Sequence, residues 1–153
     1  MGTALLLIDV INDLAFEGSA ALVSQAEPMA SRLATLEADV ARLFRVKPKH
    51  SGFFDTTLDT LLETLRIRRV ILAGIAGNIC VLFTANDAYM RDLKIFAPAD
   101  CIVSNTAADN HHALRQINTV LKGHIAESTQ LTFRPVRRAA PVSHGRLGQE
   151  SKP

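Results

Sequence analysis

Short, continuous runs of apolar residues alternate along the chain with longer segments that have the periodicity of amphipathic helices. The runs near residues 4–9, 69–74 and 94–98 have the continuous apolar character of strands that are buried on both faces of a sheet. A last short strand is expected near residues 123–127, and residues 43–47 offer a further strand beside the first.

The segments between these runs carry apolar residues at spacings of three and four, which predicts helices with one buried face. Thr56 or Thr57 can cap one of these helices, and Gly123 can end the last. Strands that alternate with helices give parallel crossover units, so the predicted fold class is a doubly wound α/β domain with helices on both faces of a parallel sheet. The predicted helices cover residues 27–44, 58–65, 77–91 and 107–121.

The composition limits the class of protein. The chain has 153 residues, of which 48% are apolar and 21% charged, so it can bury the core of one domain. Its net charge of +2 argues against a dedicated nucleic-acid-binding protein. No apolar run approaches the roughly 18 residues of a membrane span. The start, "MGTALLLID", has the pattern of a strand rather than of a signal peptide, so we expect a cytoplasmic protein with reduced thiols.

The composition changes near residue 133. We assign residues 1–132 to the folded domain. Residues 133–153 are basic, rich in Pro and Gly and almost free of large apolar side chains. Such a segment cannot bury enough apolar surface to fold, so we expect a disordered tail.

Cys80 follows a buried strand and the glycine-containing bend "GIAGN", and it lies one turn into a predicted helix. Backbone N–H groups and the positive end of the helix dipole at such a place favour thiolate over thiol. The small residues Gly74, Ala76 and Gly77 let a substrate approach the backbone, whose N–H groups could stabilise an oxyanion. The alternative is that Cys80 is a buried small apolar residue, which is the commonest role of a free cysteine.

A cysteine nucleophile needs a base and an orienting charge. Asp9 ends the first predicted strand, at the carboxyl edge of the sheet where Cys80 is also expected. Lys47 or Lys49 lies in a loop that Pro48 stiffens. Taken singly, Asp9 could cap a turn and either lysine could be solvated. The combination of the three motifs indicates a catalytic site.

The chain resembles the isochorismatase-like cysteine hydrolases, a family that includes nicotinamidases and related amidohydrolases, in four ordered stretches: "ALLLIDVINDL", "VKPKHSGFFDT", "LAGIAGNICVLFTANDAYMRDL" and "FAPADCIVSN". The resemblance implies a catalytic triad of Asp9, Lys47 and Cys80 and no cofactor. It also implies a cis peptide bond between Ile75 and Ala76, which would turn the Ala76 N–H toward an oxyanion, beside the N–H of Cys80. The implied activity is hydrolysis of a C–N bond in a small amide or related carbonyl compound, through a thioester.

The chain departs from this family between the first strand and the lysine loop. Family members usually carry another strand, a further helix and a long connection there, whereas here one helix nearly fills the gap, as if a segment were missing near Leu36 and Glu37. In nicotinamidases that region carries an Asp/His metal cluster. No histidine precedes His50, so we expect no metal, and we expect His111 and His112 to be surface residues.

Three functions compete on these residues. The first is a cysteine hydrolase that acts on a small-molecule substrate, and the second is a truncated relative with a binding or assembly role. The third is an isochorismate-type vinyl-ether hydrolase, which is disfavoured because that chemistry needs no thiol.

We expect Cys101 to be structural and not to form a disulfide with Cys80. The helix that starts near Asn78 and the loop "INDLAFEGS" are apolar for surface elements, and the shortened sheet has further apolar area to cover. We therefore expect a homo-oligomer, with no nucleic-acid or membrane partner.

Overall fold

A parallel sheet of five strands runs through the part of the chain that the computed structural model describes, residues 2–10, 19–36, 41–44 and 49–132. The strands are β1 (Gly2–Ile8), β2 (Ala41–Phe44), β3 (Ile67–Ile75), β4 (Lys94–Phe96) and β5 (Ile102–Val103). Their order is β2-β1-β3-β4, and β5 also pairs with β3. Each of these pairs is parallel, which confirms the predicted sheet. The tail expected at residues 133–153 lies outside the described residues.

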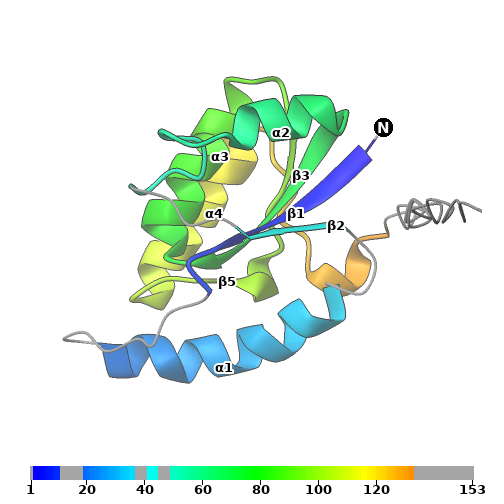
Figure 1. Ribbon diagram of the computed structural model, residues 1–153. Helices are drawn as coiled ribbons and strands as arrows, with labels where there is room; N and C mark the ends of the chain where they lie inside the picture. Colours follow the sequence, from blue (N-terminus) through cyan, green and yellow to red (C-terminus); the bar gives the residue numbers. More distant parts are fainter. Residues whose placement is uncertain (1, 11–18, 37–40, 45–48, 133–153) are drawn as a thin grey trace, which may run out of the picture.

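Helices cover both faces of the sheet, as predicted (Figure 1). The α-helices of the described residues are α1 (Ser19–Leu36), α2 (Leu58–Thr64), α3 (Leu82–Tyr89) and α4 (Ala107–Thr119). A π-helical turn, η2 (Gly77–Val81), leads from β3 into α3, and short 3₁₀ turns occur at η3 (Ala99–Cys101) and η4 (Ser128–Gln130). No helix in these ranges is both long enough and apolar enough to cross a membrane.

The central strand β1 is buried on both of its faces. Leu5 and Leu7 pack with Leu33 of α1 in one apolar cluster. Leu6 points to the other face, where it packs with buried side chains of α2, α3 and α4. Because successive side chains of a strand point to opposite faces, burial on both sides explains why the first strand is a continuous apolar run.

The strand expected beside the first is confirmed, although it occupies residues 41–44 rather than 43–47. The predicted helix over residues 27–44 is therefore wrong at its end, since α1 ends at Leu36. Residues 41–44 instead extend the sheet, with Ala41 opposite Ala4. This pairing satisfies backbone N–H and C=O groups along the edge of β1, which is the physical reason that strand replaces helix here.

The helix α1 also begins earlier than predicted, at Ser19, and it includes Pro28. A proline inside a helix removes one backbone hydrogen bond and costs about 3 kcal/mol. Leu22, Met29 and Leu33 are all buried along this helix. Their burial offsets the cost of the proline, because each large apolar side chain contributes about 1.5–3 kcal/mol when it is removed from water.

Residues 123–127 do not form the predicted strand. His124 makes an isolated parallel bridge with Phe96. Its N–H donates to the carbonyl oxygen of Ile95 at 2.9 Å, and its own carbonyl accepts from the Ala97 N–H at 2.7 Å. The segment thus extends the sheet beside β4 by a single residue, and the backbone on either side leaves the strand conformation.

The helix ends follow the sequence only in part. The N–H of Leu58 donates to Thr56 Oγ1 at 3.2 Å, so Thr56 supplies a side-chain acceptor at the start of α2. After α4 the left-handed residue is Lys122, with φ of 57°, and not Gly123 as predicted. Gly123 is required by space instead, since a Cβ there would lie 2.7 Å from Cγ2 of Ile117.

The carboxyl ends of β1 and β3 meet at Gly74, which pairs with Ile8. Gly74 has φ of 127°, a conformation that L side chains rarely adopt, and a Cβ there would lie 2.0 Å from the carbonyl oxygen of Ile8. Both the backbone conformation and the space therefore require glycine. The two strand ends approach each other because position 74 has no side chain.

Gly74→Ala is expected to lower the free energy of unfolding by about 3 kcal/mol or more, because the methyl group would overlap backbone that cannot move away. Urea unfolding followed by circular dichroism measures this loss. Gly52→Ala is the matched control, since a Cβ there would meet its nearest atoms at an ordinary 3.5 Å. Similar losses in the two variants would contradict the interpretation.

Candidate active site

The carboxyl edge of the sheet places Asp9 beside the end of β3. Asp9 directly follows β1, is half-buried and has the left-handed backbone conformation, with φ of 50°. Asp adopts this conformation more readily than most residues, so the sequence suits a sharp exit from the strand. Because Ile8 pairs with Gly74, Asp9 lies where β3 leaves the sheet.

β3 leaves the sheet through a cis peptide bond between Ile75 and Ala76, which confirms the expectation from the family resemblance. The chain then enters η2, where the N–H groups of Ile79 and Val81 both donate to the carbonyl oxygen of Ala76 at 3.1 Å. The predicted helix start at Gly77 is confirmed. Cys80, the fourth residue of η2, therefore follows the bend within one helical turn.

Polar side chains hold the side of η2 that faces α4. The N–H of Asn78 donates to Ser104 Oγ at 3.1 Å, and Ser104 Oγ donates to Asn110 Oδ1 at 3.0 Å. The amide of Asn110 donates in turn to the carbonyl oxygen of Ile102 at 3.0 Å. Gly77 leaves room for this network, since a Cβ there would lie 2.5 Å from Asn110 Oδ1. The N–H of Asn78 is thus engaged within the protein and does not face a substrate.

The thiol of Cys80 lies at the edge of the apolar core, with 9% of the residue exposed. Its Sγ is 3.8 Å from Nδ1 of His50, which is within hydrogen-bond reach for sulfur. The imidazole of His50 packs at a tilt against the ring of Phe83, with 5.6 Å between the ring centroids. The environment of Cys80 is therefore not purely apolar, which argues against the alternative of a simple core cysteine.

Hydrogen bonds fix the loop of His50 on α3. Ser51 Oγ donates to the carboxylate of Asp87, and the N–H of Gly52 donates to Thr84 Oγ1 at 3.0 Å. Thr84 Oγ1 donates to the carbonyl oxygen of Cys80 at 2.7 Å and is fully buried. One buried hydroxyl thus joins the loop to the turn that carries the cysteine. These contacts set the position of the residue before Ser51 relative to Cys80.

The residues predicted as a triad are placed to different degrees. Asp9 and Cys80 both lie at the carboxyl edge of the sheet, from β1 and from the turn after β3. Lys47 lies outside the described residues, and the structure resumes with the exposed Lys49. The contacts among Asp9, Lys47 and Cys80 therefore stay a prediction.

His50 is the residue beside the cysteine that sequence reasoning missed. The sequence drew attention to it only as the first histidine of the chain. His50 stands three residues after Lys47, in the same motif "VKPKHS", and this position was the feature of the sequence that could have pointed to it. Its place at the sulfur depends on the hydrogen bonds of Ser51 and Gly52 to α3, and these cannot be seen in the sequence.

Cys101 has a different environment. It is fully buried among Leu5, Ile71 and other apolar residues on the α1 side of the sheet, and neither cysteine forms a disulfide bond. Burial, with a further contribution from the neighbouring carboxylate of Asp100, raises the pKa of the Cys101 thiol from 9.0 to about 12. The prediction that Cys101 is structural agrees with this environment.

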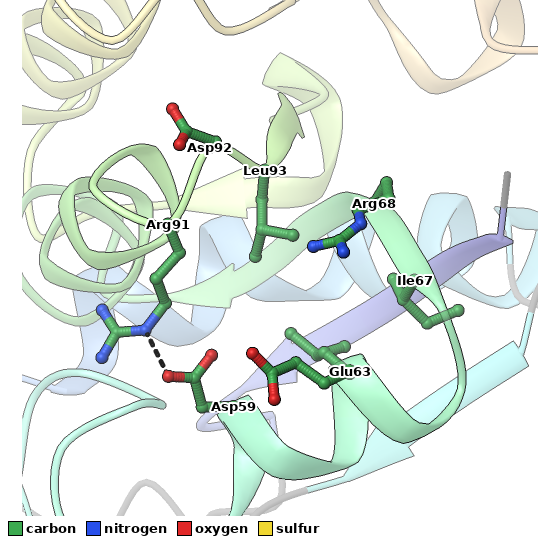
Figure 2. A pocket seen from close by; sticks show the side chains of 8 residues that line it. Asp59, Glu63, Ile67, Arg68, Arg91, Asp92 and Leu93 are labelled. Carbon is green, nitrogen blue, oxygen red and sulfur yellow. Dashed lines mark hydrogen bonds and ion pairs between the residues drawn. The ribbon is translucent and has the colours of Figure 1, made fainter.

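A charged pocket of about 190 Å³ lies at the opposite edge of the sheet, near the starts of β3 and β4 (Figure 2). Nε of Arg91 donates to the Asp59 carboxylate at 3.1 Å, and the guanidinium lies 4.5 Å from the centre of the Phe53 ring. Ile67, at the start of β3, lines this pocket, so the pocket is separated from Cys80 by the length of that strand.

His111 and His112 are exposed on α4, as predicted. The Nδ1 atom of His112 lies 3.2 Å from a guanidinium nitrogen of Arg115. Within the described ranges, no three His, Cys, Asp or Glu side chains are arranged so that they could hold a metal ion.

The family model of the isochorismatase domain matches residues 32–130. The chain belongs to the isochorismatase family. The matched range includes the described loop from Lys49 and the Cys80 turn, and it begins after Asp9. The prediction that Asp9 is a site residue therefore depends on its place in the fold and on the first strand motif, and it stays a prediction.

Relatives in the isochorismatase family cover parts of the chain. YaaI of Bacillus subtilis strain 168, an isochorismatase family protein, is 50% identical over 101 residues, which are 66% of this chain and 54% of YaaI. RutB of Methylorubrum extorquens, a ureidoacrylate amidohydrolase, is 39% identical over 74 residues, which are 48% of this chain and 30% of RutB. The chain thus spans about half the length of YaaI and less of RutB.

A solved structure shows the same fold. The crystal structure of the nicotinamidase/pyrazinamidase PncA from Bacillus subtilis superimposes with a TM-score of 0.69, covering 83% of this chain and 100% of that chain at 20% identity. At this level of identity the likeness concerns the arrangement of strands and helices.

The buried thiol of Cys101 should make stability depend on alkaline pH. The folded protein holds this proton up to about pH 12, whereas the unfolded chain releases it near pH 9.0, so the free energy of unfolding should fall between these values. Urea unfolding at several alkaline pH values, in the wild type and in Cys101→Ala, measures the effect. The variant should show the shallower decline with pH, because other titrating groups are shared by both proteins. Equal slopes would contradict the prediction.

Proposed function

We propose that this isochorismatase-family protein is a cysteine-dependent hydrolase of a C–N bond in a small amide or related carbonyl compound. The observation that carries the proposal is the convergence of Asp9 and Cys80 on one edge of the sheet, where β3 turns through a cis peptide bond into η2. Two similar proteins support the amide class, since RutB is a ureidoacrylate amidohydrolase and PncA a nicotinamidase/pyrazinamidase.

In the proposed mechanism Asp9 takes the proton of the Cys80 thiol, and Sγ forms a bond to the carbonyl carbon of the substrate. The N–H groups of Ala76 and Cys80 stabilise the oxyanion. Asp9 then gives its proton to the leaving amine as the C–N bond breaks, and a thioester remains. A water molecule, which loses a proton to Asp9, attacks the thioester, and the C–S bond breaks to release the carboxylic acid. The proton on Asp9 finally returns to the sulfur.

Lys47 is proposed to orient Asp9 and to offset negative charge when acid and thiol are both ionised. Without a cation nearby, two anions in contact would repel, and one would stay protonated. Lys47 precedes His50 by three residues, and the His50 imidazole contacts Sγ of Cys80. Three residues of extended chain span at most about 11 Å, a reach that is compatible with the proposed role of Lys47.

A truncated relative with a binding or assembly role is the second candidate. It is favoured by one observation, which is that in the described residues a single helix, α1, stands between β1 and β2, where the sequence indicated a shortened connection. In that case the fold would persist while the wall of the pocket is incomplete. The two candidates differ in whether Cys80 forms an acyl-enzyme.

The homo-oligomer expected from the sequence belongs to the same proposal. Ile79 of η2 and Phe83 of α3 are 37% and 52% exposed, so the start of this helical segment carries large apolar side chains at the surface of the described chain. An oligomer would cover such side chains. Residues 11–18, which raised the same expectation, lie outside the described residues. The cytoplasmic location likewise stays a prediction.

Cys80→Ala should reduce hydrolysis of any amide that the wild type turns over to the background rate, because the variant lacks the proposed nucleophile that forms the thioester. Assays of ammonia or amine release from a panel of small amides measure turnover, and intact mass spectrometry detects the acyl-enzyme. Cys101→Ala is the matched control and should keep its activity. Wild-type activity in Cys80→Ala would overturn the mechanism, and no turnover of the panel would favour the binding role.

Lys47→Ala and Asp9→Asn should each lower kcat/KM by about 10²–10⁴-fold, because each removes a group that handles the proton or the charge at the thiol. Lys49→Ala is the matched control and should stay within about threefold of the wild type, since an exposed lysine outside the motif position has no such role. Steady-state kinetics on the best amide compare the three variants. Equal effects of the two lysine substitutions would contradict the assignment of Lys47.

A further inference from the structure

We propose that His50 is a further catalytic residue of this site, and that its Nδ1–H donates a hydrogen bond to the thiolate form of Cys80. The inference rests on the proposed function, because it gives His50 a role at the proposed nucleophile. The contact that supports it is the 3.8 Å distance between Nδ1 of His50 and Sγ of Cys80.

The imidazole of His50 is held at the sulfur by its surroundings. Its ring packs against Phe83 of α3 at 5.6 Å between centroids and a tilt of 43°. Its backbone is followed at once by Ser51 and Gly52, which are hydrogen-bonded to Asp87 and Thr84 of the same helix. Although His50 is exposed, its backbone is fixed and its ring is packed, so its side chain has few available conformations. The short distance from its imidazole to Cys80 therefore follows from the fold.

The hydrogen-bonding chemistry of sulfur determines which form of Cys80 the contact with His50 favours. A thiol is a weak hydrogen-bond partner, whereas hydrogen bonds to an ionised group are roughly twice as strong as neutral ones. A donor at 3.8 Å from Cys80 Sγ therefore stabilises the thiolate more than the thiol. His50 forms and breaks no covalent bond in this role. The thiol proton still passes to Asp9 and then to the leaving amine, while the Nδ1 proton stays on His50.

Other charged groups belong to the elements around this pair. Lys49 precedes His50 in the loop, and Asp9 follows β1 at the same edge of the sheet. Asp87 of α3 is paired with Arg91 at 3.2 Å. Substitutions of His50 leave these groups in place, so a change in the reactivity of Cys80 reports on the imidazole.

A competing interpretation is that His50 serves only as a flat ring against Phe83. His50→Phe separates the two, because it keeps a ring and removes the donor. His50→Asn returns a donor, since its amide nitrogen can occupy a position near that of Nδ1. His111→Phe makes the same change at an exposed histidine on α4 and is the matched control.

The test measures the second-order rate of Cys80 alkylation by iodoacetamide, with peptide mapping to separate Cys80 from Cys101 and without any amide substrate. Near neutral pH we expect His50→Phe to react about tenfold more slowly than the wild type, a change that corresponds to about 1.4 kcal/mol. His50→Asn should recover most of the rate, and His111→Phe should match the wild type. The difference between His50→Phe and the wild type should narrow as the pH is raised, because ionisation of the thiol then depends less on a nearby donor.

Two results would overturn the inference. One is an equal rate in the wild type and in His50→Phe near neutral pH. The other is a rate for His50→Phe that is lower by the same factor at every pH, which would indicate a steric effect on access. Thermal unfolding confirms that each variant is folded, and His50→Ala provides the comparison if the Phe variant is not. The proposed function is judged separately by amide turnover. If the alkylation rates differ tenfold but no amide is turned over, the hydrogen bond of His50 to the thiolate is supported and the proposed hydrolase function is not. If amides are turned over but the alkylation rates are equal, the hydrolase function is supported and the role of His50 is not.

Discussion

The site depends on how closely the ends of β1 and β3 approach each other. The carbonyl oxygen of Ile8 occupies the place that a side chain at position 74 would need, 2.0 Å from where its Cβ would be. This approach brings Asp9 beside the bend that leads to Cys80. Gly77, three residues on, plays a similar part, because a Cβ there would strike the amide of Asn110 at 2.5 Å. The two glycines of "GIAG" are thus explained by the same requirement, which is room for another part of the chain.

The second link in the site is a buried hydroxyl. Thr84 accepts from the N–H of Gly52 and donates to the carbonyl oxygen of Cys80, and it is fully removed from solvent. An unsatisfied polar group in such a place costs about 1–3 kcal/mol, so displacing the loop would leave at least one of these groups without its partner. The position of the loop that carries His50 and the shape of the cysteine turn are therefore coupled through Thr84. The same hydrogen bonds therefore stabilise the fold and set the geometry of the site.

The sequence allowed a good prediction of the fold, because its strands are buried on both faces and so appear as continuous apolar runs. The end of α1 and the strand β2 were harder, since the pattern "EADVARLF" suits a helix and only the open edge of β1 makes residues 41–44 extend the sheet. The segment after α4 was wrong for a related reason, as His124 pairs with Phe96 for one residue only. In the site, the cis bond before Ala76 was expected from the family resemblance and is present. Gly74 was expected to leave room for a substrate, whereas the carbonyl oxygen of Ile8 occupies the space beside it. His50 was not predicted, because tertiary hydrogen bonds of its neighbours place it.

The two cysteines show how the same chemical group receives different properties from one chain. Cys101 lies beside Asp100 and deep in the apolar layer under α1, and both its burial and the adjacent negative charge oppose ionisation. Cys80 lies at the edge of the core, in a helical turn, with an imidazole nitrogen at 3.8 Å. The sequence contains part of this difference, since an acid precedes one cysteine and "GNI" precedes the other. The larger part comes from the face of the sheet on which each thiol lies. Cys101 comes just before β5, which pairs with the carboxyl end of β3, and it packs under α1. Cys80 packs on the opposite face, in the turn between β3 and α3. The α1 face buries its thiol completely, whereas the opposite face leaves Cys80 9% exposed and next to an imidazole nitrogen.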